Sequence, residues 1–173
     1  IEKMKVAGQI LARLDEILKR EIKVGVTTKE LDAIAEDYIR SQGAIPSFKG
    51  DGGFPGSVCT SVNDEIVHGI PSDRKLKQGD IISIDMGSYI GGFHGDAART
   101  YAVGEIAPEA QKLIDVTKQS FFEGIQYAKQ GCRLNEIGTA IQKYVEKNGF
   151  SVVRDYVGHG IGRKLHEDPS VAN

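Results

Sequence analysis

Apolar residues recur every three to four positions in the first part of the chain, which is the period of an α-helix with one buried face. Residues 2–20 carry this pattern between Lys, Arg and Glu side chains, and residues 28–40 carry it again. Thr27 and Glu30 form a Thr-x-x-Glu capping box before the second segment, and Gly43 is a suitable helix end. The chain is therefore expected to open with two amphipathic helices. Their core-facing residues are expected to be Val6, Ile10, Leu14, Ile17, Leu18, Leu31, Ile34, Ala35, Tyr38 and Ile39.

A β-hairpin is predicted at residues 81–103, where two runs of strand-forming residues flank Gly91-Gly92. With these glycines as the loop, the pairing register follows directly from the numbering. Asp85 and Asp96 then share one face of the hairpin as diagonal cross-strand neighbours, roughly 7–8 Å apart at the backbone. His94 lies on the same face.

The other segments carry weaker patterns. Residues 44–57 contain two prolines and several glycines, so they are expected to form a loop. Short strands are expected at 58–62 and 65–67, and helices at about 108–129 and 135–148. After Ser151 we expect a strand, a glycine-rich turn at 158–162 and a final strand.

The sequence also contains an internal repeat at an offset of 106 residues. The repeat matches Gly25 with Gly131, Glu30 with Glu136, Tyr38 with Tyr144 and Gly43 with Gly149. This predicts a single catalytic domain over residues 1–173, built from two related halves, about 1–105 and from about 106 on. The alternative is a chance alignment of two amphipathic helices with glycine stops. If the repeat is real, the counterpart of the hairpin falls beyond Asn173, so we expect the chain to be incomplete there.

Composition excludes several classes of protein. The 22 Lys and Arg residues nearly balance 24 Asp and Glu, and the net charge of −2 gives neither a nucleic-acid footprint nor a basic membrane anchor. Cys59 and Cys132 are too few for a disulfide framework, and no apolar run approaches the ~20 residues of a membrane span. No signal peptide precedes the first helix, so we expect a cytoplasmic protein. Because residue 1 is isoleucine, we expect the chain to be trimmed at this end as well.

The aspartate pair is the first candidate site. Two carboxylates on one sheet face repel each other and resist burial unless a positive group lies between them, and a metal ion is the simplest such group. The alternative is a pair of solvated surface aspartates. The interpretation as a metal site is favoured because all four histidines lie in glycine-bearing stretches outside the predicted helices: His68, His94, His159 and His166.

The segment 158–169 is the second candidate site. Its Gly-x-Gly-x-Gly pattern differs from the Gly-x-Gly-x-x-Gly of dinucleotide-binding folds, and no acidic residue follows about 20 positions later to bind a ribose. Glycines on both sides of His159 permit close backbone approach and free placement of the imidazole, as a metal ligand requires. A structural histidine is the alternative.

Four motifs in order along the chain resemble those of the bacterial type I methionine aminopeptidases, which are M24 metallopeptidases. They are Phe54-Pro55 with Cys59-Thr-Ser-Val-Asn63, then Val67-His68-Gly69-Ile-Pro71, then Asp85 with Phe93-His94-Gly95-Asp96, and finally Gly158-His159-Gly160-Ile-Gly162 with His166-Glu167. The resemblance extends over essentially the whole chain. It implies an α/β (α+β) pita-bread fold, with two pseudo-symmetric halves and a central antiparallel sheet covered by helices.

The resemblance implies removal of the initiator methionine from nascent chains by two-metal hydrolysis. Asp85, Asp96 and His159 match three of the family's five metal ligands; the other two are glutamates of later strands. The implied cofactors are two divalent ions, with cobalt, manganese, iron(II) and zinc all suited to the donor set. The implied partners are nascent polypeptide N-termini at the ribosome, with no nucleic acid or membrane. The complete protein is expected to be a monomer.

The same resemblance assigns further roles. His68 and His166 match the two histidines that bind the peptide backbone and stabilise the tetrahedral intermediate, so they are the candidate catalytic residues. Cys59 and Phe54 match positions that line the methionine side-chain pocket, where a thiol and an aromatic ring suit a thioether; an inert buried thiol is the alternative for Cys59. His94 is a further candidate for substrate binding.

The chain departs from the family pattern in places. Asp51 stands where an aromatic pocket residue is expected, and Ala172 stands where proline is usual. With three of five ligands and an open sheet edge, we expect this chain to have little activity and to associate. Two other readings are a pita-bread binding module without catalysis and a proline-specific peptidase. The first is disfavoured because Asp85, Asp96 and His159 are all present. The second is disfavoured by the Cys-Thr-Ser-Val-Asn run.

Overall fold

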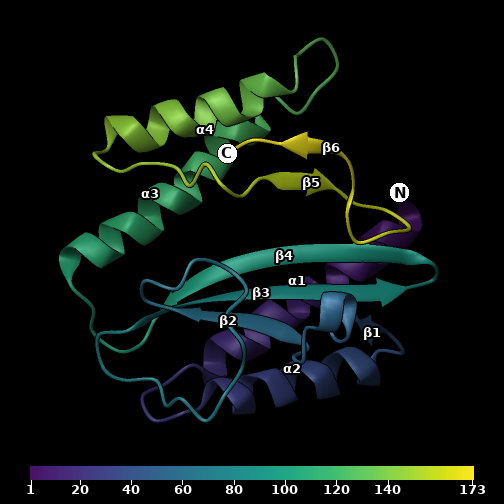
Figure 1. Ribbon diagram of the computed structural model, residues 1–173, viewed down its shortest axis with the longest axis vertical. Helices are drawn as coiled ribbons and strands as arrows, with labels where there is room; N and C mark the ends of the chain where they lie inside the picture. Colours follow the sequence, from purple (N-terminus) through teal and green to yellow (C-terminus); the bar gives the residue numbers. More distant parts are fainter. The chain divides into compact units, whose positions relative to one another are not determined.

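The computed structural model describes all residues from Ile1 to Asn173, and they form two compact units (Figure 1). Unit 1 comprises Ile1–Ala107 and the short return segment Ile161–Leu165. Unit 2 comprises Pro108–Gly160 and His166–Asn173. None of the helices combines the length and the apolar character needed to cross a lipid bilayer.

Unit 1 is an antiparallel sheet with two helices. Its elements are α1 (Glu2–Glu21), α2 (Thr28–Ser41), β1 (Ile45–Pro46), the short 3₁₀ helix η1 (Asp51–Gly53), β2 (Val58–Val62), β3 (Ile81–Ile90) and β4 (Phe93–Ala102). Strand β3 is central, because it pairs with β4 along one edge and with β1 and β2 along the other.

The two predicted N-terminal helices are confirmed, and so is the capping box. The Thr27 hydroxyl accepts a hydrogen bond from the Glu30 N–H at 3.1 Å, and the Glu30 carboxylate accepts from the Thr27 N–H at 2.7 Å. One detail of the predicted core face of α1 is wrong, since Val6 is 45% exposed. The buried face of α1 consists of Ala7, Ile10, Leu11, Leu14 and Leu18. Because an α-helix has 3.6 residues per turn, the buried positions recur at intervals of three or four residues, and Val6 falls outside the buried stripe.

The predicted hairpin forms in the predicted register. Gly91 and Gly92 have φ of 61° and 87°, which is the backbone that a tight two-residue hairpin loop requires. Gly87 pairs with Asp96 across the ladder and Asp85 pairs with Ala98. The two carboxylates therefore start from the same face of the sheet, as expected from the sequence.

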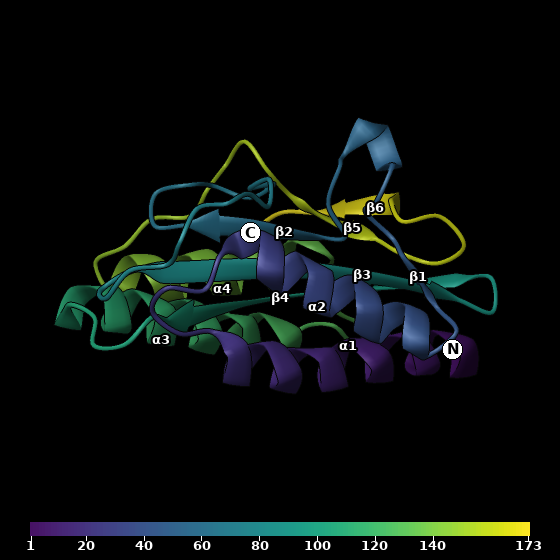
Figure 2. The same ribbon diagram turned by 90° about the horizontal axis from the view of Figure 1, so that it is seen from below.

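The sheet is one-sided. Alternate residues of β3, including Ile82, Ile84 and Met86, are buried against the helices, and α1 and α2 cover this face (Figures 1 and 2). By strand alternation, Asp85 lies on the opposite face. The functional candidates of unit 1 therefore project from the face of the sheet that the helices leave open.

The predicted strand at 65–67 is wrong. Val67 and His68 have φ of 46° and 53°, in the left-handed region that ends extended structure. Instead, the chain turns after Val62, where the Glu65 carboxylate accepts a hydrogen bond from the Val62 N–H at 2.8 Å. Glu65 is also paired with Arg74, at 2.7 Å between carboxylate and guanidinium.

Unit 2 has two packed helices and a short hairpin: α3 (Pro108–Ile125), α4 (Asn135–Lys147), β5 (Gly158–Gly160) and β6 (Glu167–Val171). Helix α3 ends four residues earlier than the predicted Lys129, because Tyr127 and Ala128 continue as a turn. The prediction of a strand directly after Ser151 is also wrong, since residues 151–157 contain no strand. The segment 158–160 that was expected to turn is itself strand β5, paired antiparallel with β6.

Glycines at positions related by the predicted repeat have similar backbone angles in the two units, each taken by itself. Gly25 and Gly131, separated by the repeat offset, both have φ of 92°. Gly43 and Gly149 follow α2 and α4 with φ of 72° and 88°. Left-handed glycines before and after α2 and α4 are compatible with two related halves, which stay a prediction.

Candidate active site

The centre of the unit 1 site is the Asp85–Asp96 pair. The two carboxyl groups are close enough to share a hydrogen bond, and Asp85 is largely shielded from water whereas Asp96 is exposed. Burial, together with the charge and hydrogen bond of Asp96, raises the pKa of Asp85 to about 7. Asp85 is therefore protonated below about pH 7, and above that pH its negative charge faces the Asp96 carboxyl without compensation.

This donor set fits a divalent cation. Hard carboxylate oxygens held together at the edge of a protein interior are stabilised by a positive ion in the same way as by a proton. Neither unit by itself gathers three His, Cys, Asp or Glu side chains into a metal-binding cluster. Asp85 and Asp96 come together within unit 1, and His159 belongs to unit 2.

Cys59 lies beside Asp85 because the two residues pair directly across β2 and β3. Burial, followed by the charges of Asp85 and Asp96, raises the pKa of the Cys59 thiol to about 12, although the His68 N–H donates to the sulfur and opposes this. Cys59 is therefore a neutral thiol at physiological pH. Its position suits apolar contact rather than nucleophilic chemistry.

An apolar cluster surrounds the thiol. Phe48, Cys59 and Leu165 are buried together, and Phe54 and Ile161 pack against them. Sequence reasoning found Cys59 and Phe54 and missed the other members. Leu165 and Ile161 belong to the return segment. Nothing in the sequence indicates that this segment packs against residues more than 100 positions earlier. Asp51 is exposed on η1, between Phe48 and Phe54.

His68 stands on a strained turn next to this cluster. Left-handed backbone costs on the order of 1–3 kcal/mol for a residue with a side chain, and Val67 and His68 both adopt it. The flanking Gly69 lies against β2, since a Cβ there would come within 2.3 Å of the Thr60 carbonyl oxygen. Strain of this kind persists only where contacts hold the turn in place.

His94 is held on the same sheet face as Asp96, as its register predicts. Its Nδ1 lies 2.9 Å from the Ser47 hydroxyl, and its ring lies against Tyr89 with 4.5 Å between ring centres. Its backbone N–H donates to the Gly162 carbonyl at 2.8 Å, which anchors the return segment at the start of β4.

His159 and His166 are neighbours within unit 2. Their ring centres lie 4.3 Å apart, and His159 Nδ1 is 2.9 Å from the Gly160 carbonyl oxygen. The predicted need for close backbone approach is confirmed at Gly160, where a Cβ would come within 2.3 Å of the Asp168 carbonyl oxygen. The residue after β6, Ala172, has its carbonyl oxygen against Gly138 of α4.

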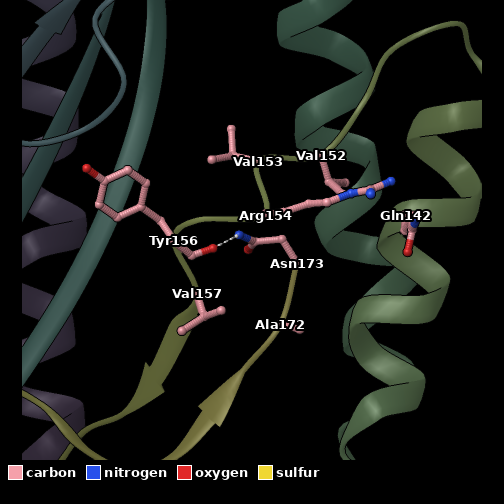
Figure 3. A pocket seen from close by; sticks show the side chains of 8 residues that line it. All are labelled: Gln142, Val152, Val153, Arg154, Tyr156, Val157, Ala172 and Asn173. Carbon is pink, nitrogen blue, oxygen red and sulfur yellow. Dashed lines mark hydrogen bonds between the residues drawn. The ribbon is translucent and has the colours of Figure 1, made fainter.

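Unit 2 also contains a pocket of about 410 Å³ (Figure 3). It is lined by Gln142, Val152, Val153, Arg154, Tyr156, Val157, Ala172 and Asn173. The Asn173 amide donates to the Tyr156 carbonyl at 3.0 Å across it. None of the residues predicted from the sequence to be functional lines this pocket.

A family model described as metallopeptidase family M24 matches residues 2–173. The chain belongs to this family. It is 58% identical to a methionine aminopeptidase of Clostridium acetobutylicum, covering 100% of this chain and 70% of the relative. It is 59% identical to methionine aminopeptidase 1 of Bacillus subtilis, covering 97% and 68%.

Structural comparison agrees with this assignment to M24. The crystal structure of a methionine aminopeptidase from Thermotoga maritima matches with a TM-score of 0.97 at 42% identity, over 99% of this chain and 70% of that one. The α/β pita-bread fold expected from the sequence is thereby confirmed. The chain therefore has the fold of the M24 metallopeptidases, and the relatives that it resembles include methionine aminopeptidases.

Proposed function

We propose that this chain is a methionine aminopeptidase that hydrolyses the first peptide bond of nascent proteins and releases the initiator methionine. The observation that carries the proposal is the Asp85–Asp96 carboxylate pair on the open sheet face, directly beside the apolar cluster around Cys59. A cation-binding pair next to a pocket for an unbranched apolar side chain is what this reaction requires. The similar relatives named methionine aminopeptidase support the same choice.

The metal ligands contributed by this chain are proposed to be Asp85, Asp96 and His159, holding two divalent ions of cobalt, manganese, iron or zinc. When bound, such ions polarise the scissile carbonyl and lower the pKa of a water molecule toward neutrality. The aspartates contribute negative charge that is stable above the raised pKa of Asp85. His159 contributes a neutral imidazole, the form in which histidine binds metals.

The other side chains are proposed to bind and orient the peptide. Cys59 and Phe54 belong to the apolar cluster, which accepts the methionine side chain and excludes water from it. His68 and His166 donate hydrogen bonds to the peptide carbonyl oxygen as negative charge develops there. His94, fixed by Ser47 and Tyr89, borders the site on the β4 side.

The proposed substrates are newly made polypeptide N-termini, presented at the ribosome in the cytoplasm, and the complete protein is proposed to act as a monomer. The small net charge of −2 supports neither nucleic acid nor a membrane as a partner. No observation favours the proline-specific peptidase or the non-catalytic module.

The deciding experiment combines metal titration and hydrolysis. Calorimetry with Mn²⁺ and with Co²⁺ is expected to detect binding that Asp96→Asn abolishes and that Asp64→Asn, at an exposed turn, leaves unchanged. The metal-loaded protein is expected to release methionine from Met-Gly-Met-Met, at the low rate expected of a chain with three of the family's five ligands, and to leave Leu-Gly-Met-Met intact. Equal binding by the Asp96→Asn variant, or equal cleavage of both peptides, would contradict the proposal.

A further inference from the structure

The strained turn that carries His68 is attached to β2 in part by Ser61, a member of the Cys59–Asn63 motif for which no individual role is predicted from the sequence. Ser61 lies on the same strand face as Cys59, since the two are separated by one residue in β2, and it is only 3% exposed. Its hydroxyl accepts a hydrogen bond from the Gly69 N–H at 3.1 Å. The Ser61 hydroxyl therefore joins β2 to the loop that carries His68.

Three neighbouring groups of β2 hold residues 68 and 69. The Cys59 sulfur accepts from the His68 N–H, the Thr60 N–H donates to the Gly69 carbonyl at 2.8 Å, and the Ser61 hydroxyl accepts from the Gly69 N–H. The Ser61 hydroxyl thus supplies the acceptor for the Gly69 N–H, next to the two residues with left-handed backbone, Val67 and His68.

The flanks of the turn are tied down separately. On one side the Glu65 carboxylate binds the Val62 N–H and Arg74. On the other side Ser72 exchanges two hydrogen bonds with Thr28, its N–H donating to the Thr28 hydroxyl at 2.8 Å. The path of residues 66–70 between these anchors therefore depends on the contacts with β2.

We propose that Ser61 is a positioning residue for His68: its hydroxyl holds Gly69 against β2 and so keeps the strained His68 turn beside Cys59 and Asp85. The role rests on the function proposed for His68. Without the hydroxyl, the Gly69 N–H loses its partner and the left-handed residues relax toward extended backbone. The imidazole then leaves the place where it meets the peptide carbonyl, although the metal-binding aspartates on β3 and β4 stay in register.

The kinetic test compares Ser61→Ala with Ser83→Ala in the metal-loaded enzyme. Ser83 lies on the same sheet face, opposite Ser61 in the β2–β3 ladder, but its hydroxyl bonds Thr100 at 2.8 Å instead of the turn. We expect Ser61→Ala to lower kcat for Met-Gly-Met-Met about tenfold while KM changes less than threefold and metal affinity is unchanged. Ser61→Thr, which retains the hydroxyl, is expected to recover most of the rate. A kcat within twofold of the unmodified enzyme, or an equal loss in Ser83→Ala, would overturn the proposal.

A second readout does not depend on activity. In hydrogen exchange followed by NMR, the Gly69 amide of Ser61→Ala is expected to exchange at least tenfold faster than in the unmodified protein, with shifted His68 imidazole signals; Ser83→Ala is expected to change neither. Unchanged exchange at Gly69 would refute the Ser61 contact itself. If the unmodified enzyme cleaves no methionyl peptide while exchange responds as expected, the proposed function fails and the Ser61 contact stands.

If Ser61→Ala does not fold, Gly69→Ala tests the same attachment from the loop side. Its Cβ would lie 2.3 Å from the Thr60 carbonyl oxygen, so the turn must detach from β2. A loss of kcat comparable to that expected for Ser61→Ala supports the proposal, and full activity overturns it.

Discussion

At the scale of single residues, Asp85 shows most clearly how position changes chemistry. An aspartate in water has a pKa near 4, but burial and the neighbouring Asp96 carboxyl raise the pKa of Asp85 to about 7. The folded protein without metal therefore binds more protons than the unfolded chain between about pH 4 and pH 7. This contribution to stability is complete below pH 4 and is lost as the pH rises through 7.

Asp85→Asn removes this titration and is expected to change the pH dependence of stability. Relative to the metal-free unmodified protein, the variant should gain more stability at pH 7.5 than at pH 4.5, by a difference on the order of 2 kcal/mol. Urea unfolding at the two pH values measures it. Asp64→Asn, at an exposed turn, serves as the control and should show no such difference. Parallel curves for Asp85→Asn and the unmodified protein would mean that the carboxyl pair is not strained.

At the scale of elements, the two units differ in how their second helix begins. Glu30 completes a capping box with Thr27 at α2. Its repeat counterpart Glu136 accepts a hydrogen bond from the Arg133 N–H at 2.5 Å, but α4 has no side-chain cap, because arginine stands where the first helix has threonine. Helix α4 therefore has half of a capping box.

Arg133→Thr is expected to complete this box and to stabilise the protein by about 0.5–1 kcal/mol, while Thr27→Ala is expected to cost about 1 kcal/mol at α2. Thermal unfolding followed by circular dichroism measures both changes. Arg133→Ala is the matched control, since it removes the same side chain without adding a hydroxyl. Equal stability of the Thr and Ala variants at position 133 would show that α4 gains nothing from the cap.

At the scale of the whole molecule, the return segment Ile161–Leu165 completes the apolar cluster around Cys59. Leu165 is 7% exposed and packs with Phe48 and Cys59, although both precede it by more than 100 positions in the chain. The hydrogen bond from the His94 N–H to Gly162 holds the segment in this place. The apolar cluster is thus a product of tertiary packing between distant parts of the sequence.

Leu165→Ala is expected to destabilise the protein by about 2–4 kcal/mol and to raise KM for Met-Gly-Met-Met, because it leaves a cavity beside the methionine side chain. Denaturant unfolding and steady-state kinetics measure the two effects. Leu134→Ala removes the same atoms at a site that is 43% exposed and should change stability by less than about 0.5 kcal/mol. A Leu165→Ala variant as stable as Leu134→Ala would show that Leu165 is not packed in this cluster.

The sequence alone was sufficient for features that depend on local periodicity and turn chemistry. The capping box at Thr27, the Gly91-Gly92 loop and the shared face of Asp85 and Asp96 all follow from spacing, because strand alternation and hairpin register are short-range rules. The assignment of catalytic and binding roles to His68, His94, His159 and His166 stays a prediction.

Features that depend on contacts between distant residues required the folded structure. The sequence predicts a strand at 65–67 because these residues favour extended backbone. The contacts of the following turn with Cys59, Thr60 and Ser61, which override this preference, are not visible in the sequence. The glycine-rich segment was expected to turn, but its Gly160 fits closely against β6 as a strand. Periodicity is set by each residue's neighbours in the chain, whereas strain, burial and pocket composition are set by residues that meet only when the chain folds.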